Sequence, residues 1–479
     1  MFRYKRKMQA EAALSGARLT DRIRLIAQLA LLVICLAGGG SSRADVYSLL
    51  YLRPLAALLL AAILLVTTKR ELRVVRVPLI LLALLAASMA IQLIPLSPEM
   101  WAALPGRSAL AGAAAAAGIA PAWRPISLTP DLTINSIISL IPPLAALLAT
   151  AGLTRKEHDL VLFVMIGAAV ASSVLGIAQL AAGADGAPYL YTVPTRGTAS
   201  GVFANRNHNA AFLAIGLLCL GHWASLSPGQ RQGRLRPQMR LGVAAAIGML
   251  LLLTIIATGS RTGSVIAVPV LIAAILKGFP KGAWQSRGGR AAAAALPVLV
   301  VCGTIALTIA AGRGAFFDRF AGFDPEAENR LKNLPVLMEM LRTFWLVGIG
   351  YGAFDPAFRW FEPDRLLHPQ YFNHAHSDWL ELVLTGGAPA ALVLAAFVVW
   401  TLVIASRVLR DRADRKGYGG LGIGIVLILG AASVSDYPLR TPLLAVLLAI
   451  GCGWAALRPS DLPASPPRDN GAGGRHRLR

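Results

Sequence analysis

The chain has 479 residues, of which 56% are hydrophobic and only 15% are charged, and its mean hydropathy is +0.61. Soluble domains carry roughly 25% charged residues, so this composition excludes a disordered chain and argues against a soluble enzyme. The formal net charge of +22 would suggest nucleic-acid binding in a soluble protein, but in so apolar a chain membrane topology is the other explanation.

Several stretches of the chain are apolar and long enough to cross a membrane as helices, which takes about 20 residues each. The twelve expected spans are 23–39, 49–68, 77–96, 132–153, 159–182, 208–224, 241–258, 262–278, 292–312, 379–406, 420–435 and 440–457. The first could be a signal peptide, but the long basic segment before it favours a retained helix. The sequence therefore predicts an all-α polytopic bundle of about 12 transmembrane helices over residues 23–457.

The positive charges alternate between successive loops. The N-terminal segment, every second loop and the C-terminal segment together hold 31 of the 46 Lys and Arg residues but only nine of the 24 Asp and Glu residues. Basic loops stay in the cytoplasm, so we expect the basic segment 1–22 and the tail 458–479 to be cytoplasmic, with the tail disordered. The whole net charge then lies on the cytoplasmic side, and no nucleic-acid partner is needed to explain it.

Two segments on the outer side are long, namely 97–131 and 313–378. Within the first, Ala109–Ala122 is Ala-rich and predicts a surface helix. The second has apolar residues at helical spacing, interrupted by Pro335, and we expect it to be ordered. The stripe consists of Leu331, Leu334, Leu337, Met338 and Leu341. It predicts either a helix along the membrane surface or one packed against the bundle.

Five polar clusters all fall on the outer side, at span ends or in outer loops. They are Asn205-Arg206-Asn207-His208, Ser260-Arg261-Thr262-Gly263, Asn329-Arg330 with Lys332, Asn373-His374-Ala375-His376-Ser377-Asp378, and Asp436-Tyr437-Pro438-Leu439-Arg440. Ionisable residues at the ends of spans within a bundle are costly and often functional. We therefore expect the bundle to gather these clusters around one cavity.

Each arginine also has a simpler explanation. Arg261 lies in a tight turn between two spans, where a guanidinium could extend to lipid phosphates instead of binding a substrate anion. The cluster 205–208 opens an apolar helix, although capping that helix requires only one of its side chains. Arg330 could form a surface ion pair with Glu326 or Glu328.

His374 and His376 are two residues apart, so on a strand they would share one face. A His-x-His pair can bind a metal ion, but no cysteine cluster or His-Glu-x-x-His motif accompanies this one. We favour a histidine that accepts a proton near neutral pH, with capping of the next helix as the structural alternative. Nucleotide-binding motifs are also lacking, so the sequence predicts no cofactor and no metal site.

Several arginines and a histidine on the outer side suggest a specific chemistry. A guanidinium group can bind two phosphate oxygens at once through two parallel hydrogen bonds, and a neutral imidazole can remove a proton from a hydroxyl. This combination fits transfer of a group from a lipid diphosphate to a hydroxyl acceptor, with the arginines stabilising the departing diphosphate.

The same motifs resemble those of the O-antigen ligase and O-antigen polymerase family of bacterial inner-membrane proteins. The resemblance covers most of the chain from about residue 190 and is strongest at the following segments. They are Gly201-Val-Phe-Ala-Asn-Arg-Asn-His208, Gly259-Ser-Arg-Thr-Gly263, Arg330 to Phe354, His374-Ala-His-Ser-Asp-Trp-Leu-Glu-Leu382 and Ser435-Asp-Tyr-Pro-Leu-Arg-Thr-Pro442. The ligase signature of the family begins at His376-Ser377 and reaches Gly387, and its last position is Ala390, where the family has Gly, Thr or Tyr.

The resemblance implies a metal- and nucleotide-independent glycosyltransferase with His376 as the base. Arg261 and Arg330 match the arginines that contact the diphosphate, while Arg206 and Arg440 match less securely. The residues His374, His208, Asn205 and Asn207 are then secondary site candidates. The implied partners are a polyprenyl-diphosphate-linked glycan donor, a lipid A core or growing glycan as acceptor, and the lipid bilayer.

The family includes ligases, which attach O-antigen to the lipid A core, and polymerases of O-antigen or exopolysaccharide. Some members glycosylate proteins instead. These motifs do not separate the activities, because donor and chemistry are shared and only the acceptor differs. A ligase is our first hypothesis and a polymerase the second. A further hypothesis, from a different functional class, is a transporter or flippase of lipid-linked sugars.

Overall fold

The computed structural model describes residue 20 and residues 22–186, 188–226, 236–278, 325–367 and 372–461, and within these ranges the chain is almost entirely helical. A first helix covers residues 22–38. The following elements are α2 (Leu49–Val66), α3 (Lys69–Val74), α4 (Arg76–Ile91), α5 (Pro98–Ala103), α6 (Ser108–Ala116), α7 (Pro130–Ile138), α8 (Ile141–Gly152), α9 (Arg155–Gly186) and α10 (Arg206–Ser225). They continue with α11 (Pro237–Ala257), α12 (Arg261–Gly278), α15 (Pro325–Phe344), α16 (Phe354–Phe361), η3 (Asp364–Leu366), α17 (Asp378–Arg410), α18 (Arg412–Lys416), α19 (Tyr418–Ser435), η4 (Pro438–Arg440) and α20 (Pro442–Ala456).

The prediction of an all-α membrane bundle is confirmed. Six helices within the described residues are long and apolar enough to cross a membrane, and two further apolar helices, α4 and α20, are shorter. The expected spans each coincide with a described helix or helix pair, except for 292–312, which lies outside the described residues together with most of the segments 1–22 and 458–479. The chain is a multi-pass membrane protein.

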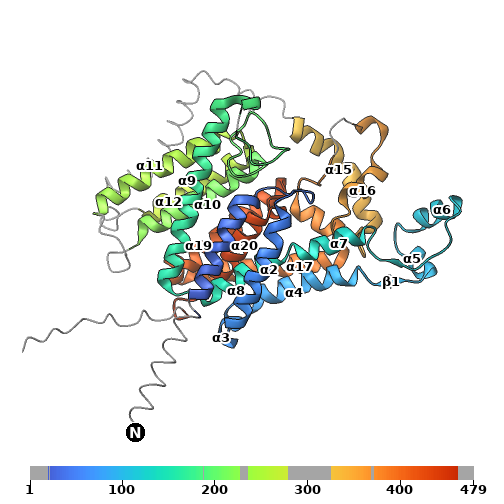
Figure 1. Cartoon of the computed structure of the whole chain (residues 1–479), viewed down its shortest axis with the longest axis horizontal. Helices are drawn as coiled ribbons and strands as arrows, with labels where there is room; N and C mark the ends of the chain where they lie inside the picture. The colour runs from blue at the N-terminus through green and yellow to red at the C-terminus, as the bar shows by residue number, and fades with distance from the viewer. Residues whose placement is uncertain are drawn as a thin grey trace, which may run out of the picture.

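The helices form two groups joined by α10 and α19 (Figure 1). In the first group α10 packs against α9, α11 and α12, and in the second α20 lies between α8 and α19. Small residues allow the close approach of α10 and α12, because a Cβ atom at Gly263 would lie 2.3 Å from Cβ of Ala210. This contact brings the first turn of α12 beside the first turns of α10.

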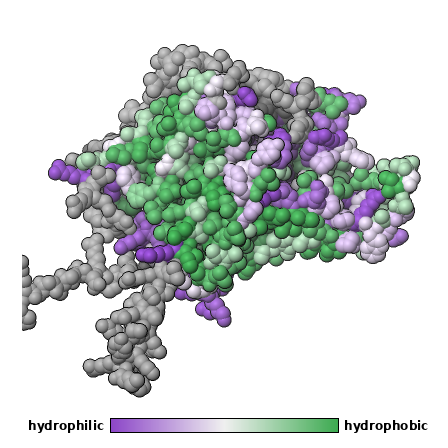
Figure 2. Space-filling view, in the orientation of Figure 1, coloured by the Kyte–Doolittle hydropathy of each residue, from purple (hydrophilic) through white to green (hydrophobic). Residues whose placement is uncertain are grey.

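Residues 97–131 and 325–367 extend to one side of the bundle, where hydrophilic side chains gather over α15, α16 and the segment of α5 and α6 (Figure 2). An antiparallel pair of two-residue strands, β1 (Pro95–Leu96) and β2 (Arg124–Pro125), closes the segment 97–131, and the pairing joins Pro95 to Pro125. The Ala-rich stretch forms the helix α6, which ends at Ala116 and is shorter than the sequence predicts.

The apolar stripe of α15 matches the predicted one only at Leu337, which is buried, and at Leu341, which is partly buried. The buried side chains are Val336, Leu337, Met340 and Phe344, while Leu331, Leu334 and Met338 are exposed. Pro335 does not end the helix, which runs to Phe344. The reason is that α15 packs against α16 and the start of α17, a contact that selects a face one position away from the face the pattern favoured.

A bend in α17 separates its first turns from its membrane-spanning part. Gly387 has a φ of +64° inside α17, followed by Pro389, so the helix direction changes there. The glycine-rich turn Gly348–Gly352 fills this bend, because the Ile349 amide donates to the Leu384 carbonyl and the Gly350 amide to the Thr385 carbonyl. The short helical segment before Gly387 is therefore held by the turn Gly348–Gly352 as well as by the bundle.

Candidate active site

The five polar clusters of the sequence meet around residues 435–440, in the connection between α19 and α20. Each of the other four clusters contacts a residue of this connection or of the α19 end that precedes it. The connection includes η4, a single 3₁₀ turn, so its polar side chains lie at the ends of helices and not inside them.

The two histidines lie in an irregular loop, neither strand nor helix, just before α17. His376 has a φ of +51°, the one positive φ among the non-glycine residues that the structure describes. Its ring centre lies 5.1 Å from that of Tyr437, and the ring centre of His374 lies 4.4 Å from that of Tyr437. The strained backbone at His376 therefore lets both rings contact one tyrosine.

The His376 imidazole has an unsatisfied nitrogen. Its Nδ1 atom is buried and has no hydrogen-bond partner among the described residues. Burial lowers the pKa of His376 to about 4, and the nearby Arg330 guanidinium contributes to the same shift. The imidazole is therefore neutral at physiological pH, which leaves a nitrogen able to accept a proton.

Buried carboxylates hold the neighbouring histidine and an arginine in place. Glu381, on the first turn of α17, has its Oε1 atom 3.0 Å from Nδ1 of His374 and 3.1 Å from Nη2 of Arg440. Its other oxygen accepts the backbone amide of Ala375 at 2.9 Å. Asp378 lies 3.7 Å from Nε of Arg440 and accepts a hydrogen bond from the Ser433 hydroxyl. The helix cap is Ser377, not a histidine.

The start of α10 joins the site through Asp436. Asn205 is the N-cap of α10, since its side chain accepts the amide of Asn207, and its Nδ2 atom donates to Asp436 at 3.4 Å. Nε2 of the buried His208 lies 3.8 Å from the Asp436 carboxylate. Burial alone would raise the pKa of Asp436, but His208, His376 and Arg330 outweigh it, so the pKa is lowered. Asp436 is therefore an anion in the centre of the site.

The predicted diphosphate-binding arginines lie at the α19 end. Arg330 of α15 donates from Nη1 to the Ser435 carbonyl at 2.5 Å, and the hydroxyl of Thr262 lies 2.6 Å from that of Ser435. Thr262 follows Arg261 in the first turn of α12. Arg330 and the first turn of α12, which begins at Arg261, therefore come from separate segments to the same helix end, whereas Arg206 is the first residue of α10 and Arg440 lies on the Glu381 side.

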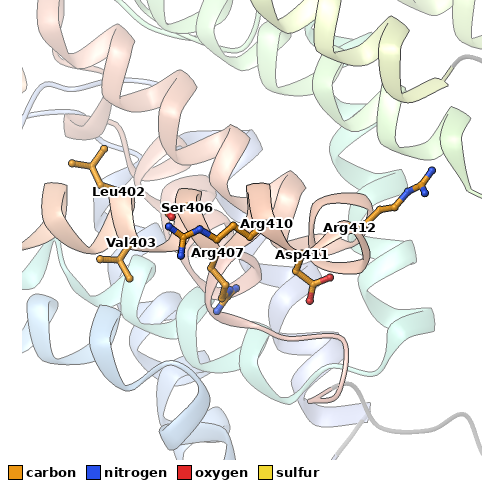
Figure 3. A pocket seen from close by; sticks show the side chains of 7 residues that line it. All are labelled: Leu402, Val403, Ser406, Arg407, Arg410, Asp411 and Arg412. Atoms are coloured by element: carbon orange, nitrogen blue, oxygen red, sulfur yellow. The ribbon is translucent and has the colours of Figure 1, made fainter.

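A polar cavity of about 320 Å³ adjoins the site on the His374 and Arg440 side. Its other walls come from residues 41–53, the α7 helix and the start of α16. A larger open hollow of about 930 Å³ lies at the opposite end of α17, lined by Leu402, Val403, Ser406, Arg407, Arg410, Asp411 and Arg412 (Figure 3). It contains none of the site residues predicted from the sequence.

Sequence reasoning assigned no role to Glu381, Asp436 or Tyr437, although all three lie inside the motifs noted above. Their signal was present as carboxylates and an aromatic residue beside candidate histidines and arginines, but only the fold shows that they contact them. Within the described residues no group of three or more His, Cys, Asp or Glu side chains is arranged to hold a metal ion.

Part of the chain matches a known protein family. Residues 246–395 match the family described as O-Antigen ligase, a range that contains Arg261, Arg330, His374 and His376. The comparison with curated proteins found no match. Residues 246–395 therefore contain an O-antigen ligase family domain, and together with the helical membrane bundle this match supports the O-antigen ligase and polymerase family and a role in glycan processing at a membrane.

Proposed function

We propose that this protein is a glycosyltransferase of the bacterial inner membrane that works at the outer face. It moves a glycan from a polyprenyl diphosphate to a hydroxyl group of an acceptor, and our first choice of acceptor is the lipid A core. Both termini would lie in the cytoplasm, as the distribution of Lys and Arg indicates.

In this proposal His376 removes the proton from the acceptor hydroxyl. The hydroxyl oxygen then forms a bond to the anomeric carbon of the donor while the bond from that carbon to the diphosphate oxygen breaks. The proton stays on the imidazole, and the electron pair leaves with the polyprenyl diphosphate. Arg261 and Arg330 stabilise the negative charge that develops on this leaving group, so no nucleotide is needed.

The observation that carries the proposal is the convergence of Arg330 and the start of α12 on Ser435, next to a histidine with a free buried nitrogen. Guanidinium groups for a diphosphate and a neutral imidazole for a hydroxyl are the two functions that this transfer requires. The guanidinium groups and the imidazole come from separate segments of the chain. A surface salt bridge or a helix cap would not require these segments to meet.

The imidazole pKa of about 4 is low for a base, and a bound donor corrects this. The diphosphate would neutralise Arg330, which is one cause of the lowered pKa of His376, and its own negative charge would favour the imidazolium. The base would therefore become stronger when the donor is in place.

The test of the proposed function replaces His376 and Arg261 separately by alanine in a strain that lacks the chromosomal copy. Each variant, present at the wild-type level in the membrane, should lose surface polysaccharide while the lipid-linked glycan accumulates on the outer leaflet. Normal surface polysaccharide in either strain would contradict the assignment.

Gel electrophoresis of lipopolysaccharide from a deletion strain identifies the acceptor. Loss of the whole O-chain ladder, with polymer retained on the lipid carrier, identifies a ligase, whereas a single-unit band without a ladder identifies a polymerase. An unchanged ladder indicates exopolysaccharide or protein glycosylation. Accumulation of the lipid-linked glycan on the inner leaflet would instead indicate a flippase.

A further inference from the structure

The cavity of about 320 Å³ beside His374 is lined by both polar and apolar side chains, and the proposed transfer chemistry uses none of its hydroxyl or amide groups. Hydroxyl and amide groups line it, including those of Ser42, Ser136, Asn135 and Asn373. Its volume is at the lower end of the range for small-molecule sites, so it has room for about one sugar unit. Groups that both donate and accept hydrogen bonds suit the hydroxyl groups of a carbohydrate.

The charged side chains of this cavity are paired, with one exception. Arg43 binds Asp45, with Nε 2.9 Å from Oδ1, and Arg440 binds Glu381. Asp355 binds Arg359, which lies outside the cavity. Four of the five Arg and Asp side chains that line the cavity therefore have an oppositely charged partner within the protein.

The exception is Arg53 on α2. Its Nη1 atom donates to Oδ1 of Asn135 on α7 at 2.6 Å, and it makes no ion pair with a carboxylate of the described residues. Asn135 is an amide, so it orients the guanidinium without neutralising it. Arg53 is therefore a half-buried cation at the cavity wall whose partner is neutral, and such a cation is suited to bind an anionic group of a ligand.

We propose that this cavity is a subsite for an anionic sugar unit, one that carries a carboxylate or a phosphate group, of a glycan substrate. Arg53 binds the anionic group, Asn135 orients the guanidinium, and the hydroxyl and amide lining binds the sugar hydroxyls. The cavity ends at His374, so the bound unit lies next to the histidine loop. That the bound sugar is part of a substrate rests on the proposed function, whereas the binding of an anionic sugar is tested independently.

The test uses the full-length protein in lipid nanodiscs and saturation-transfer NMR of four probes, namely glucuronic acid, glucose 6-phosphate, glucose and inorganic phosphate. The two anionic sugars should bind at least about tenfold more tightly than glucose, because a charge-assisted hydrogen bond is stronger than a neutral one. Equal binding of glucose and the anionic sugars would overturn the inference. Equally tight binding of inorganic phosphate would do so as well, since the site would then recognise an anion without its sugar.

Two variants test the cation from different directions. Arg53→Gln removes the charge, and Asn135→Asp keeps Arg53 but supplies it with a carboxylate partner. Both should lower the affinity for the anionic sugars about tenfold or more and leave glucose binding unchanged. Arg53→Lys keeps the charge and should retain part of the preference. Arg124→Gln, which removes an arginine outside the cavity, is the matched control and should behave like the wild type.

The source of the sugar is identified by competition with a short-chain polyprenyl diphosphate that carries one N-acetylglucosamine. If the donor analogue displaces glucuronic acid, the subsite belongs to the donor glycan, and if both bind together it belongs to the acceptor. His376→Ala should leave sugar binding intact. A change in transfer without a change in sugar binding therefore tests the proposed function and not the subsite. Unchanged binding of the anionic sugars in both Arg53→Gln and Asn135→Asp would overturn the subsite alone.

Discussion

The Nδ1 atom of His374 lies 3.0 Å from Oε1 of Glu381, a carboxylate that is 1% exposed and also contacts Arg440. A buried carboxylate that orients an imidazole leaves the other ring nitrogen free to accept a proton. This relationship makes His374 a second candidate for the base, beside His376, and it shows that one glutamate contacts both His374 and Arg440.

We expect Glu381→Gln to lower the transfer rate and the stability together. The glutamine has the same shape but no charge, so Arg440 loses its closest partner and His374 loses a charged acceptor. The loss of stability should be about 2 kcal/mol, measured by thermal unfolding in detergent. Glu339→Gln, at an exposed position on α15, is the control. An unchanged melting temperature and rate would contradict the role given to Glu381.

The pH dependence of transfer should distinguish the free enzyme from the donor complex. His376 must be neutral to accept a proton, so kcat/KM should fall as the pH drops through about 4. In kcat the corresponding limb should lie at higher pH, because the bound diphosphate favours the imidazolium. A variant without His376 should lack this limb, and its persistence there would assign the limb to another group.

Arg261 and Arg330 should contribute to the transition state more than to folding. Replacing either by glutamine should reduce transfer about a hundredfold or more, because it removes a donor to the leaving diphosphate. Lysine should restore part of the rate, since it keeps the charge but not the paired donors. The exposed Arg342 on α15 supplies the control variant Arg342→Gln. Equal losses in all three glutamine variants would indicate a general effect of charge.

The bend at Gly387 predicts a position where even alanine is not tolerated. Its φ of +64° disfavours any residue with a Cβ atom, and an added Cβ would lie 2.6 Å from the backbone nitrogen of Gly348. We expect Gly387→Ala to lower the stability by at least about 1–2 kcal/mol. Gly167→Ala, in α9 where an added Cβ meets no atom within 4 Å, should be neutral or stabilising. Similar melting temperatures for the two variants would contradict this explanation.

A buried hydrogen bond at the other end of the bundle should matter for stability only. The Tyr418 hydroxyl donates to Oδ1 of Asp159 at 2.5 Å, and Asp159 is buried. Tyr418→Phe removes the donor and should cost about 1–3 kcal/mol. Transfer per folded molecule should stay unchanged, because the contact is at the α9 and α19 ends remote from His376. A lower rate at equal amounts of folded protein would mean that the two ends of the bundle are coupled.

Much of the architecture followed from local properties of the chain. Helices that cross a membrane need long apolar stretches, and the bilayer leaves few other choices for the backbone, so the expected spans other than 292–312 agree with the described helices. Lys and Arg in alternate loops likewise indicate an orientation without knowledge of any contact. The motifs around Arg261, Arg330 and His376 were also sufficient to indicate the family.

Individual contacts between distant segments of the chain could not be predicted from the sequence. The buried face of α15 depended on α16 and α17, and the roles of Glu381, Asp436 and Tyr437 depended on the connection between α19 and α20, which is about 60 residues from the histidine loop in sequence. The unpaired charge of Arg53 likewise became visible only when Asn135, from another helix, was found beside it. Hydropathy and charge patterns are properties of neighbours along the chain, whereas pairing, burial and cavity shape arise from packing, and for this reason only the tertiary structure decided which charges are satisfied.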